Sequence, residues 1–353
     1  MDHLVLYCRP GFEPECAAEI TELANSLGVA GYARTDRGQG YVVYHCLVEQ
    51  GALQLVTELP FRQLIFARQW FAAQPLIEGL PAHDRIGPLL QQLDTLPQCG
   101  ELMIETADTN EAKELAGFCR KFTAPCAAAM RRHGLLSAKR TQRLPRLHLF
   151  FLDSSRVYAG ISNPGNHAPQ PMGIPRLKFP AAAPSRSTLK LDEAFLHFLS
   201  ANERETLLCP GLRAVDLGAA PGGWTWQLVK RHIRVTAVDN GPMAESLMES
   251  GLVQHAMEDG FQYEPRKPVD WMVCDMADQP TKVAKRMALW LERGWCRRII
   301  FNLKLPMKKR YASVVECCEL ISQQLDQAGV GFALDMKQLY HDREEVTGYL
   351  RVA

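Results

Sequence analysis

Short apolar segments alternate with segments of helical periodicity through the second half of the chain. The expected strands there are 213–217, 235–239, 271–274 and 298–303, and the expected helices are 224–231, 242–250, 281–291 and 311–327. This alternation predicts a parallel, doubly wound sheet, because parallel strands need crossover connections. Two further strands, 332–339 and 346–352, are expected to close the sheet as an antiparallel pair. Such sheets bind ligands beyond the carboxyl ends of their strands.

The turn after the first of these strands, residues 216–224, reads DLGAAPGGW. Gly218, Gly222 and Gly223 allow the backbone to approach a ligand closely. The turn has neither the G-x-G-x-x-G spacing of dinucleotide-binding folds nor the pattern of a P-loop. It therefore predicts a site for a nucleoside joined to an amino acid, with Asp216 able to meet a cationic amine.

Two more acidic residues follow the next strands. Asp239 ends the second strand, 23 positions after Asp216, where a carboxylate can accept both hydroxyls of a ribose. Asp259 follows the third strand, within Glu258-Asp259-Gly260, and could accept from an adenine amino group. A single aspartate at a strand end more often caps a helix. Three such residues after successive strands favour a bound ligand.

Residues 216–223 resemble the first motif of methyltransferases that use S-adenosylmethionine, and 221–224 (PGGW) resembles the FtsJ-like ribose 2′-O-methyltransferases. The segment 185–193 (SRSTLKLDE) is similar to the S-R-x-x-x-K-L-x-E segment that precedes the sheet in this family. Ala220 stands where related enzymes often carry Cys, and the residue stays small. The resemblance implies a catalytic tetrad of Lys190, Asp275, Lys304 and Glu345, with Glu344 as the neighbouring alternative for the acid. It also implies that S-adenosylmethionine is bound by Ser187, Ala220, Pro221, Gly222, Gly223, Asp239, Asp259 and Asp275.

Segments along nearly the whole chain, among them 6–13, 66–71, 172–180 and 302–311, resemble a bacterial branch of this family that acts on large-subunit ribosomal RNA. The resemblance implies a ferredoxin-like piece over 1–60 and a THUMP RNA-binding domain over 61–162. A Pro-rich linker (163–185) and a Rossmann-like methyltransferase domain (186–353) follow. The implied substrate is the 2′-hydroxyl of a cytidine in 23S ribosomal RNA, either free or in a large-subunit assembly precursor, and a monomer is expected.

Methyl transfer to a ribose oxygen requires that the hydroxyl lose its proton. An ordinary lysine, with a pKa near ~10.4, is charged at neutral pH. Burial and a neighbouring cation both lower a lysine pKa. We therefore expect Lys304 to be the general base with a lowered pKa and Lys190 to supply the cation. Glu345 is expected to orient them and Asp275 to serve both cofactor and tetrad; no metal is needed. The plain alternative is a structural Lys304–Asp275 salt bridge.

The first half of the chain is expected to be α/β, with strands at 4–8, 41–46, 64–71, 101–106 and 146–152 and helices at 13–27 and 110–121. The net charge is only +1, yet residues 115–152 and 154–191 contain no Asp or Glu. The first of these segments carries Arg120, Lys121, Arg131, Arg132, Lys139, Arg140, Arg143 and Arg146. Acid-free basic segments of this kind predict a surface for a polyanion.

The 11 cysteines include no C-x-x-C pair, which indicates reduced thiols and not a disulfide framework or a zinc site. No apolar run approaches the ~18 residues of a membrane span, and the first residues lack the features of a signal peptide. A cytoplasmic protein is expected.

Two other functions stay open at this stage. One is an S-adenosylmethionine enzyme that acts on a base or a small molecule. The other is an RNA-binding ribosome assembly factor whose domain binds S-adenosylmethionine without catalysis. The Lys-Asp-Lys-Glu set argues against both. Cys274 could suggest thiolate chemistry on cytosine, but its place within an apolar strand favours a buried structural residue.

Overall fold

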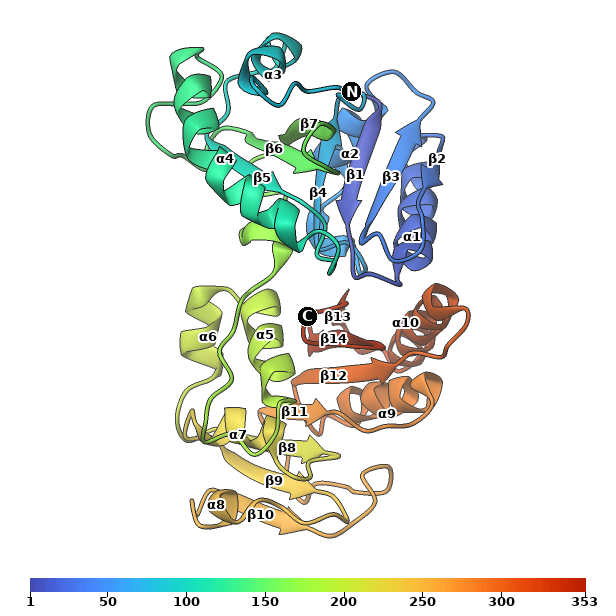
Figure 1. Ribbon diagram of the computed structural model, residues 1–353. Helices are drawn as coiled ribbons and strands as arrows, with labels where there is room; N and C mark the ends of the chain where they lie inside the picture. Colours follow the sequence, from blue (N-terminus) through green and yellow to red (C-terminus); the bar gives the residue numbers. More distant parts are fainter. The chain divides into compact units, whose positions relative to one another are not determined.

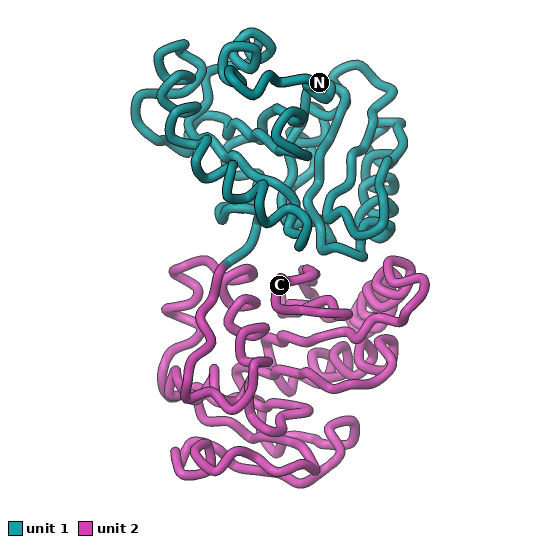
Figure 2. Tube along the Cα trace, viewed as in Figure 1, with its two compact units in different colours: residues 1–175 teal, residues 176–353 magenta.

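The computed structural model describes residues 1–353, which form two compact units, Met1–Pro175 and Arg176–Ala353 (Figure 2). Each unit contains one seven-stranded sheet with helices packed against it (Figure 1). The expected fold class, α/β with a Rossmann-like sheet preceded by another α/β region, is confirmed.

The sheet of the first unit has the order β2-β3-β1-β4-β7-β6-β5 and is antiparallel except for the β5–β6 pair. Its strands are β1 (His3–Tyr7), β2 (Gly31–Arg34), β3 (Tyr41–Cys46), β4 (Gln69–Ala73), β5 (Glu101–Glu105), β6 (Arg146–Phe151) and β7 (Val157–Ser162). Its helices are α1 (Glu13–Ser26), α2 (Gly51–Glu58), α3 (Ile86–Gln92) and α4 (Lys113–Arg132), with short 3-10 turns at η1 (Phe61–Gln63) and η2 (Pro171–Gly173).

The pairing of β4 with β7 joins the expected ferredoxin-like and THUMP pieces into this one sheet. Ala72 lies opposite Ile161 and Ala73 opposite Gly160. A Cβ at Gly160 would lie 1.9 Å from the carbonyl oxygen of Ala72, so only glycine permits this close approach.

Two expectations for the first unit need correction. The strand expected over 64–71 begins only at Gln69, because the carboxylate of Glu19 on α1 accepts the backbone N–H groups of Ile65 and Phe66 at 2.5 and 3.0 Å. These N–H groups are therefore not free for a sheet. The helix expected over 110–121 continues to Arg132 because its later turns bury Cys126 and Met130, in spite of Pro125.

The Pro-rich segment expected to be a linker divides between the units. Residues 163–175 belong to the first unit, where the side-chain amide of Asn166 donates to the carbonyl oxygens of Val56 and Leu59 at 2.7 and 3.0 Å. Residues 176–185 belong to the second unit.

The sheet of the second unit has the order β10-β9-β8-β11-β12-β14-β13. Five strands are parallel, and β14 is antiparallel to both of its neighbours, which confirms the expected closing pair. The strands are β8 (Arg213–Leu217), β9 (Arg234–Val238), β10 (Val253–Ala256), β11 (Trp271–Cys274), β12 (Arg298–Lys304), β13 (Phe332–Lys337) and β14 (Glu345–Val352). The helices are α5 (Thr188–Phe198), α6 (Ala201–Leu207), α7 (Gly223–Val229), α8 (Glu245–Met248), α9 (Pro280–Glu292) and α10 (Arg310–Gln327).

Helices α5 and α7 cover one face of this sheet and share a buried cluster with it that includes Phe195, Trp224 and Trp271. Helices α9 and α10 lie side by side, with α9 against β12 (Figure 1). The helix expected over 242–250 shrinks to the single turn of α8, because the N–H of Ala244 bonds to the carbonyl oxygen of Pro221 at 3.0 Å.

The chain runs from β8 outward to β10 and then returns to β11 on the other side of β8. This reversal is the topological switch point at which open α/β sheets bind ligands. The predicted glycine turn follows β8, and β11 and β12 end at Cys274 and Lys304, so the candidate residues gather at one edge. All cysteines are free. No helix combines the length and the apolar character needed to cross a membrane.

Candidate active site

The glycine turn between β8 and α7 is tightly packed. Gly218 and Gly222 have φ angles of +77° and +114°, which favour glycine. A Cβ on Gly222 would lie 2.2 Å from Cδ1 of Leu247, and one on Gly223 would lie 2.1 Å from Oγ of Ser187. Ser187 at the start of α5 therefore lies beside the turn. Larger residues at these glycines would push the turn away from its neighbours.

Asp216 lies beneath the turn and not on its surface. Its side chain is fully buried, and its Oδ2 accepts a hydrogen bond from the hydroxyl of Thr225 in α7 at 2.6 Å, whereas Oδ1 has no partner. Burial raises the pKa of Asp216 to about 7; Thr225 opposes this, and the carboxylates of Asp275 and Asp239 add to it. The carboxylate is turned to α7, and its expected contact with a ligand amine stays a prediction.

Asp239 and Asp259 lie on consecutive loops at the same edge. Asp239 is partly exposed and accepts the backbone N–H groups of Ala220 and Gly241 at 3.0 and 2.7 Å, which ties it to the glycine turn. Asp259 is exposed and accepts the N–H of Phe261 at 2.9 Å. Both carboxylates keep lone pairs for a ligand. Pro221, between Ala220 and Gly222, is exposed on the same turn.

The four residues of the expected tetrad converge from three strand ends and one helix. Lys304 Nζ lies 2.7 Å from Asp275 Oδ1 and 3.0 Å from Glu345 Oε1. Lys190 Nζ lies 2.8 Å from Glu345 Oε1 and 3.6 Å from Asp275 Oδ2. The side chains are 11–27% exposed, so the cluster is partly shielded from water but can be reached.

The register of β12 against β14 explains why Glu345, and not Glu344, joins the lysines. Lys304 lies directly opposite Glu345 in this antiparallel pair. Glu344 is exposed and its Oε2 pairs with Arg310 at 2.5 Å instead. The one-residue offset turns the two glutamates to different surroundings.

The expected lowering of the Lys304 pKa is wrong for this arrangement. Burial lowers the pKa of Lys304, but Asp275 and Glu345 together outweigh it, and the pKa lies above its ordinary value. Burial also raises the pKa of Glu345, whereas the lysines and the N–H of Arg343 lower it to about 2. The cluster is therefore two ammonium groups paired with two carboxylates.

Three residues that support the tetrad were not assigned a role from the sequence. Asn302 donates from Nδ2 to Asp275 Oδ1 at 3.0 Å, and Thr347 bonds to Asn302 at 2.7 Å. Glu193, one turn after Lys190 on α5, accepts the N–H groups of Tyr340 and His341 at 2.8 and 2.9 Å, which holds the segment before β14. Asn302 could have been found, because it shares a face of its strand with Lys304 two residues later.

Comparisons with known proteins cover the same regions of the chain. Family models match residues 1–71 (RlmM ferredoxin-like domain), 84–163 (ribosomal RNA large subunit methyltransferase M, N-terminal) and 183–329 (FtsJ-like methyltransferase). Ribosomal RNA large subunit methyltransferase M of Cellvibrio japonicus is 52% identical over 352 residues, which cover 100% of both chains. The chain belongs to the ribosomal RNA large subunit methyltransferase M family. The protein of that name from Shigella sonnei is 54% identical over 99% of this chain and 96% of its own.

Membership of this family confirms the methyltransferase and FtsJ-like predictions, and with them the class of cofactor, S-adenosylmethionine. Among solved structures, TrmN from Thermus thermophilus aligns over 100% of both chains at 16% identity with a TM-score of 0.34, a likeness too distant to add to this.

The residues at the carboxyl edge fit S-adenosylmethionine by their chemistry. That molecule carries an ammonium group, a sulfonium, a ribose diol and an adenine amino group, and all of these favour acidic acceptors. Asp239, Asp259 and Asp275 supply such acceptors on three successive loops, beside a turn whose glycines leave no side chain above the backbone.

The expected basic surface of the first unit is present in part. Arg120, Lys121, Arg131, Arg132, Lys139 and Arg143 are exposed. Arg146 is an exception, because it is 1% exposed in its side chain and pairs with Glu101 at 2.7 Å. It is a structural residue and not part of a surface for a polyanion.

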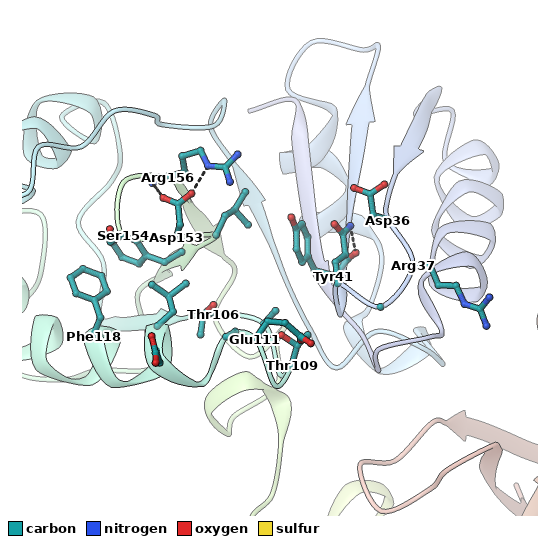
Figure 3. Close-up of a pocket in the computed structure, with 18 residues that line it drawn as sticks. Asp36, Arg37, Tyr41, Thr106, Thr109, Glu111, Phe118, Asp153, Ser154 and Arg156 are labelled. Atoms are coloured by element: carbon teal, nitrogen blue, oxygen red, sulfur yellow. Dashed lines mark hydrogen bonds and ion pairs between the residues drawn. The ribbon is translucent and has the colours of Figure 1, made fainter.

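A hollow of about 990 Å³ opens on the same unit, between the 36–41 loop, the start of α4 and residues 151–156 (Figure 3). Its lining carries the acids Asp36, Glu111, Glu114 and Asp153 against two cations, Arg37 and Arg156. Arg156 is already paired with Asp153 at 2.6 Å. The hollow is thus poorly suited to RNA, unlike the exposed basic residues.

Proposed function

We propose that this chain methylates the ribose 2′-hydroxyl of a cytidine in 23S ribosomal RNA, free or in a large-subunit assembly precursor. The observation that carries the proposal is the convergence of Lys190, Asp275, Lys304 and Glu345 beside the glycine turn. A lone salt bridge at a strand end would not bring a second lysine and a second carboxylate into contact with the first pair. The cytidine and the 23S assignment follow from the family resemblance.

Bound S-adenosylmethionine would supply an electrophilic methyl group on a positively charged sulfur. Lys304 Nζ is proposed to take the proton of the 2′-hydroxyl as the ribose oxygen forms its bond to the methyl carbon. The methyl–sulfur bond would break in the same displacement, and the sulfur would leave as a neutral thioether. Asp275 and Glu345 fix the position of Nζ through bonds of 2.7 and 3.0 Å, and Lys190 holds Glu345 from the other side at 2.8 Å. Lys190, Asp275 and Glu345 therefore orient the base.

The electrostatics impose a condition on this mechanism. Since the carboxylates raise the pKa of Lys304, the amine form is a minor species at neutral pH. Turnover should then rise as the pH is raised, because each step toward alkaline pH increases the fraction of Lys304 that can accept a proton.

Binding of the other partners is proposed as follows. Asp216 supports the cofactor site from beneath the glycine turn. The site itself is lined by Ser187, Gly218, Ala220, Pro221, Gly222, Gly223, Asp239, Asp259 and Asp275. The region 61–162 acts as a THUMP domain that binds RNA, with the exposed arginines and lysines of α4 and the following loop as phosphate contacts. The active form is a monomer.

The test is transfer of labelled methyl groups to ribosomal RNA from cells that lack the protein. Deproteinised 23S RNA and intact large subunits are assayed side by side, and the product is digested to nucleosides. We expect 2′-O-methylcytidine as the labelled product with one of the two substrates. Labelled base, or RNA binding without any transfer, would overturn the proposal and favour a base methyltransferase or an assembly factor respectively.

A further inference from the structure

A chain of buried hydrogen bonds connects Asp275 of the tetrad to a second acid, Asp342. Asn302 Nδ2 lies 3.0 Å from Asp275 Oδ1, Thr347 Oγ1 lies 2.7 Å from Asn302 Oδ1, and the same hydroxyl lies 2.9 Å from Asp342 Oδ2. Asn302 and Thr347 are 0% exposed and Asp342 is 1% exposed. The groups must therefore satisfy one another.

The orientation of the Asn302 amide follows from Asp275. Asp275 Oδ1 also accepts from the ammonium of Lys304 at 2.7 Å, so it is a charged acceptor. It must face the NH₂ group of Asn302 and not the amide oxygen. The amide oxygen then faces Thr347, and the single hydroxyl proton of Thr347 is used in that bond.

The contact between Thr347 and Asp342 at 2.9 Å needs a proton of its own, and only Asp342 can carry it. We propose that Asp342 is a neutral carboxylic acid that donates to Thr347 and, through Asn302, orients Asp275. Asp342 and Thr347 are thus positioning residues. Their role in turnover rests on the proposed ribose methyl transfer, whereas the protonation of Asp342 does not.

The groups around Asp342 agree with a neutral side chain. The N–H of Leu339 donates to Oδ2 at 3.0 Å, and Oδ1 is buried without a hydrogen-bond partner, which is costly for an anion. Burial raises the pKa of Asp342 well above its ordinary value. The Leu339 N–H and Lys190 oppose this, and Glu193 and Glu345 add to it.

A neutral Asp342 preserves the balance of charge in the tetrad. Lys190 and Lys304 then face two carboxylates, those of Asp275 and Glu345. A third negative charge nearby would hold the lysine protons more tightly. The neutral acid thus provides a rigid hydrogen-bonded support for Asp275 without lowering the fraction of Lys304 that is present as the free amine.

Infrared spectroscopy of the full chain, with ¹³C in the aspartate carboxyl groups, tests the protonation state. We expect an isotope-sensitive C=O band of a carboxylic acid on the alkaline side of neutrality, where Asp216, with a pKa of about 7, is ionised. The band should vanish in Asp342→Asn and remain in the control Asp335→Asn, whose native side chain is paired with Arg351. A spectrum unchanged by Asp342→Asn would overturn the proposal. If Asp342→Asn does not fold, Thr347→Val is used instead, because it removes the hydroxyl that accepts the Asp342 proton. A C=O band at an unchanged position in Thr347→Val would then overturn the proposal.

Steady-state kinetics tests the positioning role. We expect Thr347→Val to lower kcat roughly tenfold, in line with other residues that orient a catalytic group, with the Kd for S-adenosylmethionine and the KM for RNA unchanged. Thr347→Ser keeps the hydroxyl and should restore kcat; Thr206→Val, on the exposed surface of α6, is the matched control. Wild-type kcat in Thr347→Val would overturn the positioning role. If wild-type protein shows the infrared band but transfers no methyl group, the proposed function fails while the protonation of Asp342 stands.

Discussion

Replacing Asp216 with asparagine should raise the free energy of unfolding of the second unit, and this increase should be larger at higher pH. The pKa of Asp216 rises on folding from 3.8 to about 7, chiefly through burial. Above the ordinary pKa the unfolded chain has released this proton while the folded chain still holds it, so stability falls as the pH rises from about 4 to about 7. At about 1.4 kcal/mol per pKa unit, the full cost of the carboxylate is about 4 kcal/mol at alkaline pH.

The asparagine variant avoids this cost, since its amide oxygen can still accept from Thr225. The difference in free energy of unfolding between the variant and the wild type should increase by about 3 kcal/mol between about pH 5 and about pH 9. The increase is smaller than the full cost of about 4 kcal/mol because the wild type is already partly destabilised at about pH 5. Urea unfolding followed by tryptophan fluorescence measures it, since all tryptophans except Trp70 lie in the second unit. Asp326→Asn at the exposed end of α10 is the matched control. An advantage that does not change with pH would refute the argument, because any effect of packing alone is independent of pH.

The remaining predictions concern the tetrad and the RNA. Lys304→Ala should retain S-adenosylmethionine binding by calorimetry but show no methyl transfer; measurable turnover would remove Lys304 as the base. The logarithm of wild-type kcat should rise with pH through the alkaline range that the fold tolerates, and a plateau at neutral pH would contradict the raised pKa of Lys304. The pKa of Glu345 is lowered to about 2, so its contribution to the free energy of unfolding is present above the ordinary pKa of 4.5 and is lost as the pH falls toward 2. In Glu345→Gln, denaturation curves should show a free energy of unfolding that falls less steeply over this acid range. Lys308 and Lys309 are exposed just after β12, and each should add about 0.7 to the magnitude of the slope of log binding constant against log salt for single-stranded RNA. Replacing both with alanine should reduce the magnitude of this slope by about 0.7 per residue. The control Lys285→Ala on α9 should leave the slope unchanged.

Sequence periodicity predicted most strands and helices of the second unit to within one or two residues, but no range was expected for α5, α6 or β10. Periodicity did not predict the strands correctly where a strand is short or where polar side chains bond to the backbone. Strand β2 has only four residues, and β7 is interrupted by small residues at Ala159 and Gly160, so neither produces a clear alternation. The strand expected at 64–71 begins only at Gln69, because the carboxylate of Glu19 accepts the backbone N–H of Ile65, which lies 46 positions away in the sequence.

The candidate site shows the same limit. Lys190, Asp275 and Lys304 were expected only from the resemblance to the FtsJ-like family, and the structure brings these three side chains together. The choice of Glu345 over Glu344 depends on the register between two distant strands, which no local pattern reveals. The direction of the Lys304 pKa depends on the distances to two carboxylates, and the depth of Asp216 depends on how the turn folds over it. These are properties of three-dimensional packing.

The position of β14 between β12 and β13 has a consequence for synthesis of the protein. While the ribosome is still making the segment up to residue 337, the five parallel strands can already associate, but β13 has no neighbour to join and Lys304 has no acid across from it. The final strand must add to the open edge of β12 and pair with β13 on its other side, and it delivers Glu345 and Thr347 as it does so. Growing chains can therefore bury most of their apolar surface well before they can carry out chemistry, and catalytic competence arrives as one of the last events of folding.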